Sequence, residues 1–155
     1  MKIRLMAAFA LLFVVVFTQG FLFPAHAMGD RQVVRIINEC RRSHGLKPLR
    51  DDPRLMQSSR LKVIDMTRQG YFDHTSPAGE PFHVNFRRVG YTYGRVGEVL
   101  AGGCENERCV LDVWLRSPPH RESMLSPAFQ DIGCSSARAP DGRGFYVVCH
   151  FGRTR

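Results

Sequence analysis

Apolar residues recur at helical spacing in the part of the chain that follows residue 27. The first set lies three or four positions apart and consists of Val33, Val34, Ile37 and Cys40. This spacing places the four side chains on one helix face. Asp30 precedes the set and can cap a helix, and Gly45 follows it as a terminator. The pattern predicts a helix that begins at Asp30 and ends at Gly45.

A second helix is predicted between Asp52 and Gly70. Asp52 is a favourable N-cap, and Pro53 takes the first helical position, where a missing backbone N–H costs nothing. One face of the segment is lined by Leu55, Ser59, Val63 and Met66. Because these residues share a face, we expect them to be buried.

Two shorter helices are predicted downstream. The first ends at Gly90, and the second is capped by Asn106 and cannot continue through Pro118-Pro119. Their inward-facing residues are Phe82, Phe86 and Val89 in the first, and Val110, Val113 and Trp114 in the second. Both segments are short, so we expect packing rather than helix propensity to stabilise them.

The apolar pattern changes to strand-like runs in the second half of the chain. These runs cover residues 96–101, 132–135 and 145–149, and a turn containing Pro-Asp-Gly separates the last two. Helices that precede and separate a few antiparallel strands are typical of a layered α+β domain. The sequence shows no internal repeat or linker, so we expect one domain over residues 28–155.

The first 27 residues have the pattern of a secretory signal peptide. Lys2 and Arg4 precede an apolar run, and Ala25-His26-Ala27 forms a small-x-small cleavage site. The alternative is a membrane anchor, but Gln19-Gly20 and Pro24 interrupt the apolar stretch. We therefore expect cleavage after Ala27, a secreted or periplasmic protein, and no transmembrane anchor after processing.

The charge of the processed chain is moderately positive. Removal of Lys2 and Arg4 lowers the formal net charge of the whole chain from +8 to +6. This charge favours anionic cell-envelope surfaces over neutral ones. The arginines are scattered and no groove-reading motif is present, so we expect no nucleic-acid partner.

All five cysteines lie in the predicted exported part of the chain, where oxidising conditions favour disulfides. Cys104 and Cys109 bracket a short polar loop, and Cys134 and Cys149 flank the predicted turn between two strands. We expect a disulfide within each pair, and the second would stabilise the fold by about 3 kcal/mol. Cys40 is left over and is predicted to be a free thiol.

Three polar residues are candidates for chemistry. His74, Glu98 and His120 are too far apart in the sequence for local structure to join them. If the fold gathers them, two imidazoles and a carboxylate can form a divalent-metal site or an acid–base site. The alternative is structural, with Glu98 accepting hydrogen bonds from loop amides or from an imidazole.

The order of several short motifs resembles the CAP superfamily of cysteine-rich secretory, antigen-five and pathogenesis-related proteins. These motifs are Asn38 to Leu49, Phe72 to Gly79, Gly90-Tyr91, Gly97 to Ala101, Trp114 to Leu125, Ile132-Gly133 and His150 to Gly152. They cover nearly all of residues 28–155 and fit the short bacterial single-domain branch best. The resemblance implies a three-layer α-β-α sandwich with a small, mainly antiparallel sheet, and a cleft that gathers His74, Glu98 and His120.

The chain departs from the family pattern at the cleft. The family often has a second glutamate three residues after the tryptophan, where this chain has Ser117, and an asparagine where it has Val99. Ser117 is therefore an additional candidate for the site, and so is His150, which alternates with core strand positions and could face the cleft. No nucleophile elbow accompanies the serines. These departures weaken the prediction of catalysis more than they weaken the prediction of the fold.

The sequence favours a non-enzymatic extracytoplasmic binding module, expected to be a monomer. Its cleft would bind a small ligand, or Zn²⁺ or another divalent cation through His74 and His120, with Glu98 as a possible third ligand. A metal-dependent hydrolase, peptidase- or esterase-like, is the alternative that uses the same residues. Lipid binding is a further alternative, implied by the resemblance alone.

Overall fold

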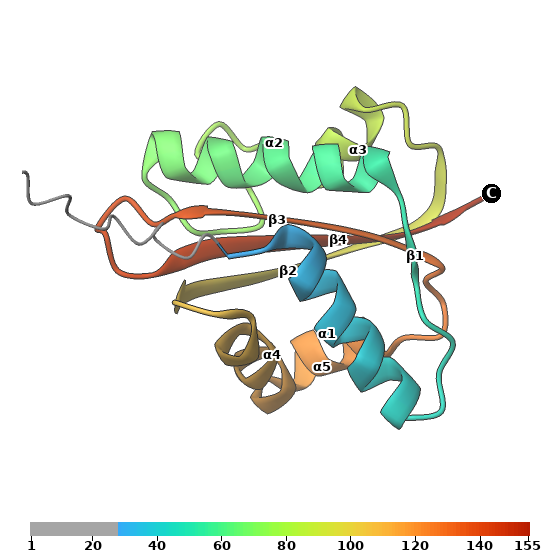
Figure 1. The fold of residues 1–155 in the computed structure, drawn as a ribbon. Helices are drawn as coiled ribbons and strands as arrows, with labels where there is room; N and C mark the ends of the chain where they lie inside the picture. The colour runs from blue at the N-terminus through green and yellow to red at the C-terminus, as the bar shows by residue number, and fades with distance from the viewer. Residues whose placement is uncertain (1–27) are drawn as a thin grey trace, which may run out of the picture.

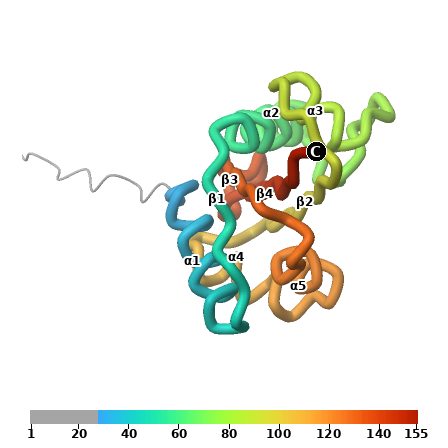
Figure 2. Tube along the Cα trace, turned by 90° about the vertical axis from the view of Figure 1, so that its right-hand side faces the viewer, coloured from blue at the N-terminus to red at the C-terminus, as the bar shows by residue number. Residues whose placement is uncertain are grey.

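A four-stranded sheet lies between two layers of helices in the computed structural model, which describes residues 28–155 (Figure 1). The predicted signal peptide, residues 1–27, lies outside the described residues. The helices are α1 (Asp30–Ser43), α2 (Pro53–Gln69), α3 (Val84–Arg88), α4 (Glu107–Arg116) and α5 (Pro118–Leu125). Helices α2 and α3 cover one face of the sheet, and α1, α4 and α5 cover the other (Figure 2). The predicted α-β-α layering is confirmed.

The order of the strands leaves β2 at one edge of the sheet. The strands are β1 (Arg50–Asp51), β2 (Tyr93–Cys104), β3 (Asp131–Arg138) and β4 (Phe145–Thr154), in the spatial order β1-β3-β4-β2. Strand β1 is parallel to β3, and the other two pairs are antiparallel. The short β1 was not predicted, because its two exposed residues carry no strand pattern.

The ends of α1 and α2 follow the prediction with one correction. The Asp52 carboxylate caps α2 by accepting from the backbone N–H of Arg54 at 2.8 Å. Asp30, however, does not cap α1; it is the first helical residue, and Gly29 holds the cap position. The Asp30 carboxylate instead accepts from the backbone N–H and the hydroxyl of Ser136, both at 2.8 Å. Two donors from β3 thus replace the local capping bond.

The larger part of the core lies between the sheet and the layer formed by α1, α4 and α5. Trp114 is fully buried at its centre, and its indole N–H donates to the Leu100 carbonyl at 2.8 Å. The expected burial of Val113 is wrong, since its exposed fraction is 42 %, and Leu111 is buried instead. Because residues 111 and 114 are three apart, they lie on the same helix face, which points toward the core, whereas residue 113 lies on another face.

The prolines that end α4 also begin the next helix. Helix α4 ends at Arg116, in agreement with the prediction, but α5 starts at Pro118 and was not predicted. A proline at the first helical position is favourable because its φ is already helical and its N–H is not needed. Among the described helices, α5 included, none has both the length and the apolar character needed to cross a membrane.

Two disulfides connect the predicted pairs of cysteines. One joins Cys104 to Cys109 at the start of α4, and the other joins Cys134 to Cys149. The second pair lies in direct register between β3 and β4, so it crosslinks neighbouring strands. Cys40 forms no disulfide within the described part of the chain.

Candidate functional site

Glu98 is the centre of a buried polar cluster on the sheet. It lies on β2 directly opposite His150 of β4, and the side chains of both residues are completely buried. The His150 Nε2–H donates to Glu98 Oε2 at 2.7 Å. On the other side of the ring, the Ser58 hydroxyl of α2 lies 2.7 Å from His150 Nδ1. Because Glu98 only accepts, the proton of a neutral His150 belongs on Nε2, and Ser58 donates to Nδ1.

His74 occupies the other oxygen of the same carboxylate. Its Nδ1 lies 2.7 Å from Glu98 Oε1, and its side chain remains 49 % exposed at the surface. The two imidazoles therefore occupy both carboxylate oxygens, one each. With the Nδ1 proton of His74 held by Glu98, the lone pair of a neutral ring lies on Nε2.

The hydrogen bonds fix the direction in which each of these groups titrates. Burial would raise the pKa of Glu98, but the hydrogen bonds from His150 and His74 outweigh it, and the pKa lies below its ordinary value. The hydrogen bond to Glu98 raises the pKa of His74. Complete burial lowers the pKa of His150 despite the same carboxylate. Glu98 is therefore ionised, and it lies between a neutral His150 and a His74 that can still gain or lose a proton.

His120 approaches from the opposite helical layer. It belongs to α5, which lies across the sheet from α2 (Figure 2). Its Nδ1 is buried and is the single fully buried side-chain polar atom of the described residues without a hydrogen-bond partner. Burial, together with the nearby charge of His74, lowers the pKa of His120. An unpaired buried ring nitrogen is costly, and a water or a ligand can supply its missing partner.

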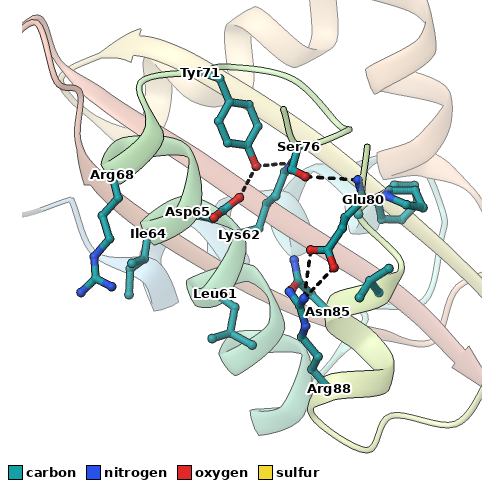
Figure 3. Close-up of a pocket in the computed structure, with 13 residues that line it drawn as sticks. Leu61, Lys62, Ile64, Asp65, Arg68, Tyr71, Ser76, Glu80, Asn85 and Arg88 are labelled. Carbon is teal, nitrogen blue, oxygen red and sulfur yellow. Dashed lines mark hydrogen bonds and ion pairs between the residues drawn. The ribbon is translucent and has the colours of Figure 1, made fainter. Parts of the chain in front are cut away.

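A buried lysine supports the loop that carries His74. Lys62 of α2 is 2 % exposed, and its Nζ donates to the His74 carbonyl at 3.0 Å and to the Tyr71 hydroxyl at 3.1 Å. The Tyr71 hydroxyl donates in turn to the Asp65 carboxylate (Figure 3). Lys62, Tyr71 and Asp65 all line a pocket of about 220 Å³. Burial lowers the pKa of Lys62, although Glu98 and Asp65 oppose this.

Sequence reasoning missed Lys62, although a signal for its position was present. Residues 55, 59, 62 and 66 share one helix face, and a charged residue on an otherwise buried face needs a partner. Ser117, which was also a candidate, lies half-buried between α4 and α5, and its side chain caps neither helix.

The described residues contain no group of three or more histidine, cysteine, aspartate or glutamate side chains arranged to hold a metal ion. In the structure, Glu98 contacts the Nδ1 of His74 and the Nε2 of His150. The imidazoles of His74 and His120 remain as candidate donors, and His74 is close enough to influence the pKa of His120.

The fold and the order of the motifs agree with the comparisons. The family model described as the cysteine-rich secretory protein family, CAP, matches residues 34–151, which is most of the chain. The chain belongs to the CAP family. CAP membership accounts for the α-β-α layering and for the convergence of residues from the loop after α2, from β2 and from β4.

Two bacterial proteins are similar to this chain. An uncharacterized Bacillus subtilis protein, YkwD, is 39 % identical over 105 residues, which make up 67 % of this chain and 40 % of that protein. This chain therefore spans about two fifths of the length of that relative. An uncharacterized protein of Borreliella burgdorferi is 25 % identical over 138 residues, covering 86 % of this chain and 87 % of that protein.

Solved bacterial structures share the fold. An outer surface protein from Borrelia burgdorferi has a TM-score of 0.74 at 23 % identity, with 81 % of this chain and 92 % of that chain covered. An extracellular protein from Bacillus anthracis that contains an SCP domain has a TM-score of 0.71 at 26 % identity. The match covers 80 % of this chain and 40 % of that one.

Proposed function

We propose that this CAP protein is an extracytoplasmic binding module whose ligand site is the cleft between His74 and His120. The observation that carries the proposal is the complete use of Glu98, because each of its two carboxylate oxygens accepts from an imidazole. A completely buried carboxylate held in this way orients a histidine and is shielded from a substrate. The site is therefore suited to holding a ligand.

The donor set fits a weakly held divalent cation such as Zn²⁺. His74 is half-exposed and its Nε2 is left free because Glu98 holds Nδ1, whereas the unpaired Nδ1 of His120 is buried, so a cation would reach it only within the fold. Two imidazoles leave the remaining positions of a tetrahedral ion to water or to a small ligand. When bound, the ion would supply a Lewis-acid centre for an anionic group of that ligand.

Two observations argue against the alternative of a metal-dependent hydrolase. A general base must reach the proton that it removes, but both oxygens of Glu98 are occupied and buried. The position where family members often carry a second carboxylate is Ser117. Without either carboxylate free, the cleft lacks a carboxylate general base, and any activation of water would fall to His74 Nε2.

An extracytoplasmic location is part of the proposal. The two disulfides favour an oxidising compartment. The similar solved structures include an outer surface protein and an extracellular protein. The predicted signal peptide would supply the route of export.

Calorimetric titration of metal-free protein with Zn²⁺ tests the site. We expect one Zn²⁺ to bind, and His74→Ala and His120→Ala each to weaken binding by at least about tenfold, because each removes one of two ligands. All variants should carry Cys40→Ser, since the Cys40 sulfur lies 3.9 Å from the His44 ring and this pair can itself bind zinc. His83→Ala, at the N-cap of α3 and outside the hydrogen bonds of Glu98, is the matched control.

The affinity for Zn²⁺ is also expected to depend on pH. Protons compete with the metal for His74, whose pKa is raised by Glu98, so the affinity should begin to fall at a pH above the ordinary histidine value of about 6.5. Identical isotherms for the Cys40→Ser parent and both cleft variants made in it would remove the metal site. Zinc-dependent turnover of a peptide or ester panel, lost in Glu98→Gln, would favour the hydrolase instead.

A further inference from the structure

A second pocket lies on the other helical layer, apart from the His74 cleft. It has a volume of about 630 Å³ and is formed by the C-terminal end of α1, residues 45–50, and residues 127–130 after α5. These segments meet beside α1 and α5 in Figure 1. None of its lining residues belongs to the His74, Glu98, His150 and His120 cluster. Its volume lies within the range of small-molecule sites.

Arg41 forms the floor of this pocket and is only 2 % exposed. Its Nε donates to the Lys47 carbonyl at 3.0 Å, and its Nη1 donates to the carbonyls of Met124 and Ser126 at 2.6 and 3.0 Å. These bonds fix the guanidinium plane. The remaining nitrogen, Nη2, has no hydrogen-bond partner among the described residues, yet it is not among the fully buried polar atoms. Its two N–H groups are therefore free to face the pocket.

The charged groups around the pocket all have the same sign. Lys47 and Arg50 join Arg41 in the lining, and no acidic side chain of the described residues lines it. Arg50 is paired with Asp131 at 2.9 Å but keeps 71 % of its side chain exposed, whereas Lys47 has no ion-pair partner in the described part of the chain. Arg41 and Lys47, which have no carboxylate partner among the described residues, give the cavity a positive potential that favours an anion.

The rest of the lining is mainly apolar and flat. Leu46, Pro48, Pro127 and Phe129 form the walls. The Phe129 ring stacks on Phe151 with centroids 5.5 Å apart, so the core fixes its position. A fixed aromatic wall beside a fixed guanidinium suits a ligand that combines a planar apolar group with an anionic oxygen group.

We propose that this pocket binds a small organic anion, with a carboxylate or phosphate on Arg41 Nη2 and Lys47 and an apolar group against Phe129. A planar donor pair on arginine recognises either oxyanion, so both headgroups belong to the same chemistry. The pocket works independently of the His74 cleft, and its occupancy does not require metal.

The test is a titration of ¹⁵N-labelled protein followed by amide chemical shifts. The probes are benzoate, phenyl phosphate, and benzamide as the uncharged analogue of benzoate. We expect saturable shifts of the amides of Gly45, Leu46 and Gln130 with both anions, and the tighter of the two identifies the preferred headgroup. Benzamide should bind at least about tenfold more weakly, because it lacks the charge-assisted hydrogen bonds.

Lys47→Glu provides the decisive variant, because Lys47 is exposed and has no ion-pair partner to lose within the described residues. It should weaken benzoate binding at least about tenfold by placing a negative charge at the pocket. Arg31→Glu, an exposed residue at the start of α1, makes the same charge change far from the pocket and should leave binding unchanged. Equal affinity for benzamide and benzoate, or equal loss in both variants, would overturn the proposal.

Discussion

Gly133→Ala is expected to lower the free energy of unfolding by about 3 kcal/mol or more, because it inserts an atom where helix and sheet backbones touch. A Cβ at Gly133 would lie well inside 3.0 Å of the backbone atoms of Leu55 and Met56. Backbone atoms cannot rotate away as a side chain can, so α2 must move off β3. Gly133 is also paired with His150, and this movement would pull Ser58 away from that ring.

Urea unfolding of the wild type and the variant measures this effect. The matched control is Gly94→Ala in β2, where the nearest atom to an added Cβ is a side-chain carbon of Arg155 at 3.6 Å, an ordinary contact. The control should change the free energy of unfolding by less than about 1 kcal/mol. If both variants unfold at the same urea concentration, the direct contact of α2 with β3 does not restrict residue 133 to glycine.

Glu98→Gln is expected to destabilise the protein by about 2–4 kcal/mol, although the side chain keeps its shape. Glutamine has one acceptor oxygen, and its amide N–H₂ would meet an imidazole that also donates. Either His74 or the fully buried His150 then loses its acceptor. His150 can adapt only by shifting its proton to Nδ1, which requires Ser58 to accept instead of donate.

The same substitution should change how stability depends on pH. The pKa of His74 is raised in the folded protein, so its pairing with Glu98 stabilises the fold fully below about pH 6.5 and is lost as pH rises through the folded-state pKa. In Glu98→Gln the main cause of the raised pKa disappears, and the His74 pKa should fall. An NMR titration of the His74 ring measures this directly.

Glu80→Gln is the matched control for the carboxylate. Glu80 forms an exposed ion pair with Arg88 at 2.9 Å, and loss of such a pair costs less than about 1 kcal/mol. The His74 pKa should stay unchanged in this control. Equal stability of Glu98→Gln and the wild type would mean that Glu98 does not hold two imidazoles.

Local signals in the sequence were sufficient for much of the fold. The Asp52 cap, Pro53 at the first helical position and the left-handed Gly70 define α2 within the segment itself. The cysteine pairs were predictable because one spans a short loop and the other flanks a turn. In each of these cases, the interacting groups lie close together in the sequence.

The features that the sequence did not predict depend on distant partners. Asp30 bonds Ser136, which lies 106 residues away, and no local pattern shows that β3 would supply two donors. The pairing of His150 with Glu98 follows from the register of β2 and β4, so His150 could only be an additional candidate beforehand. His74 and His120 were chosen from the sequence, but the commitment of both Glu98 oxygens required the fold.

The position of the ring protons on His74 and His150 tests the central claim most directly. Long-range ¹H–¹⁵N correlation spectra should be recorded above the pKa of His74, with rings assigned through single histidine variants. We predict the proton of His74 on Nδ1 and that of His150 on Nε2, each held by Glu98. A His74 proton on Nε2 would show that Glu98 does not accept a hydrogen bond from His74, and it would contradict the account in which one carboxylate orients both imidazoles.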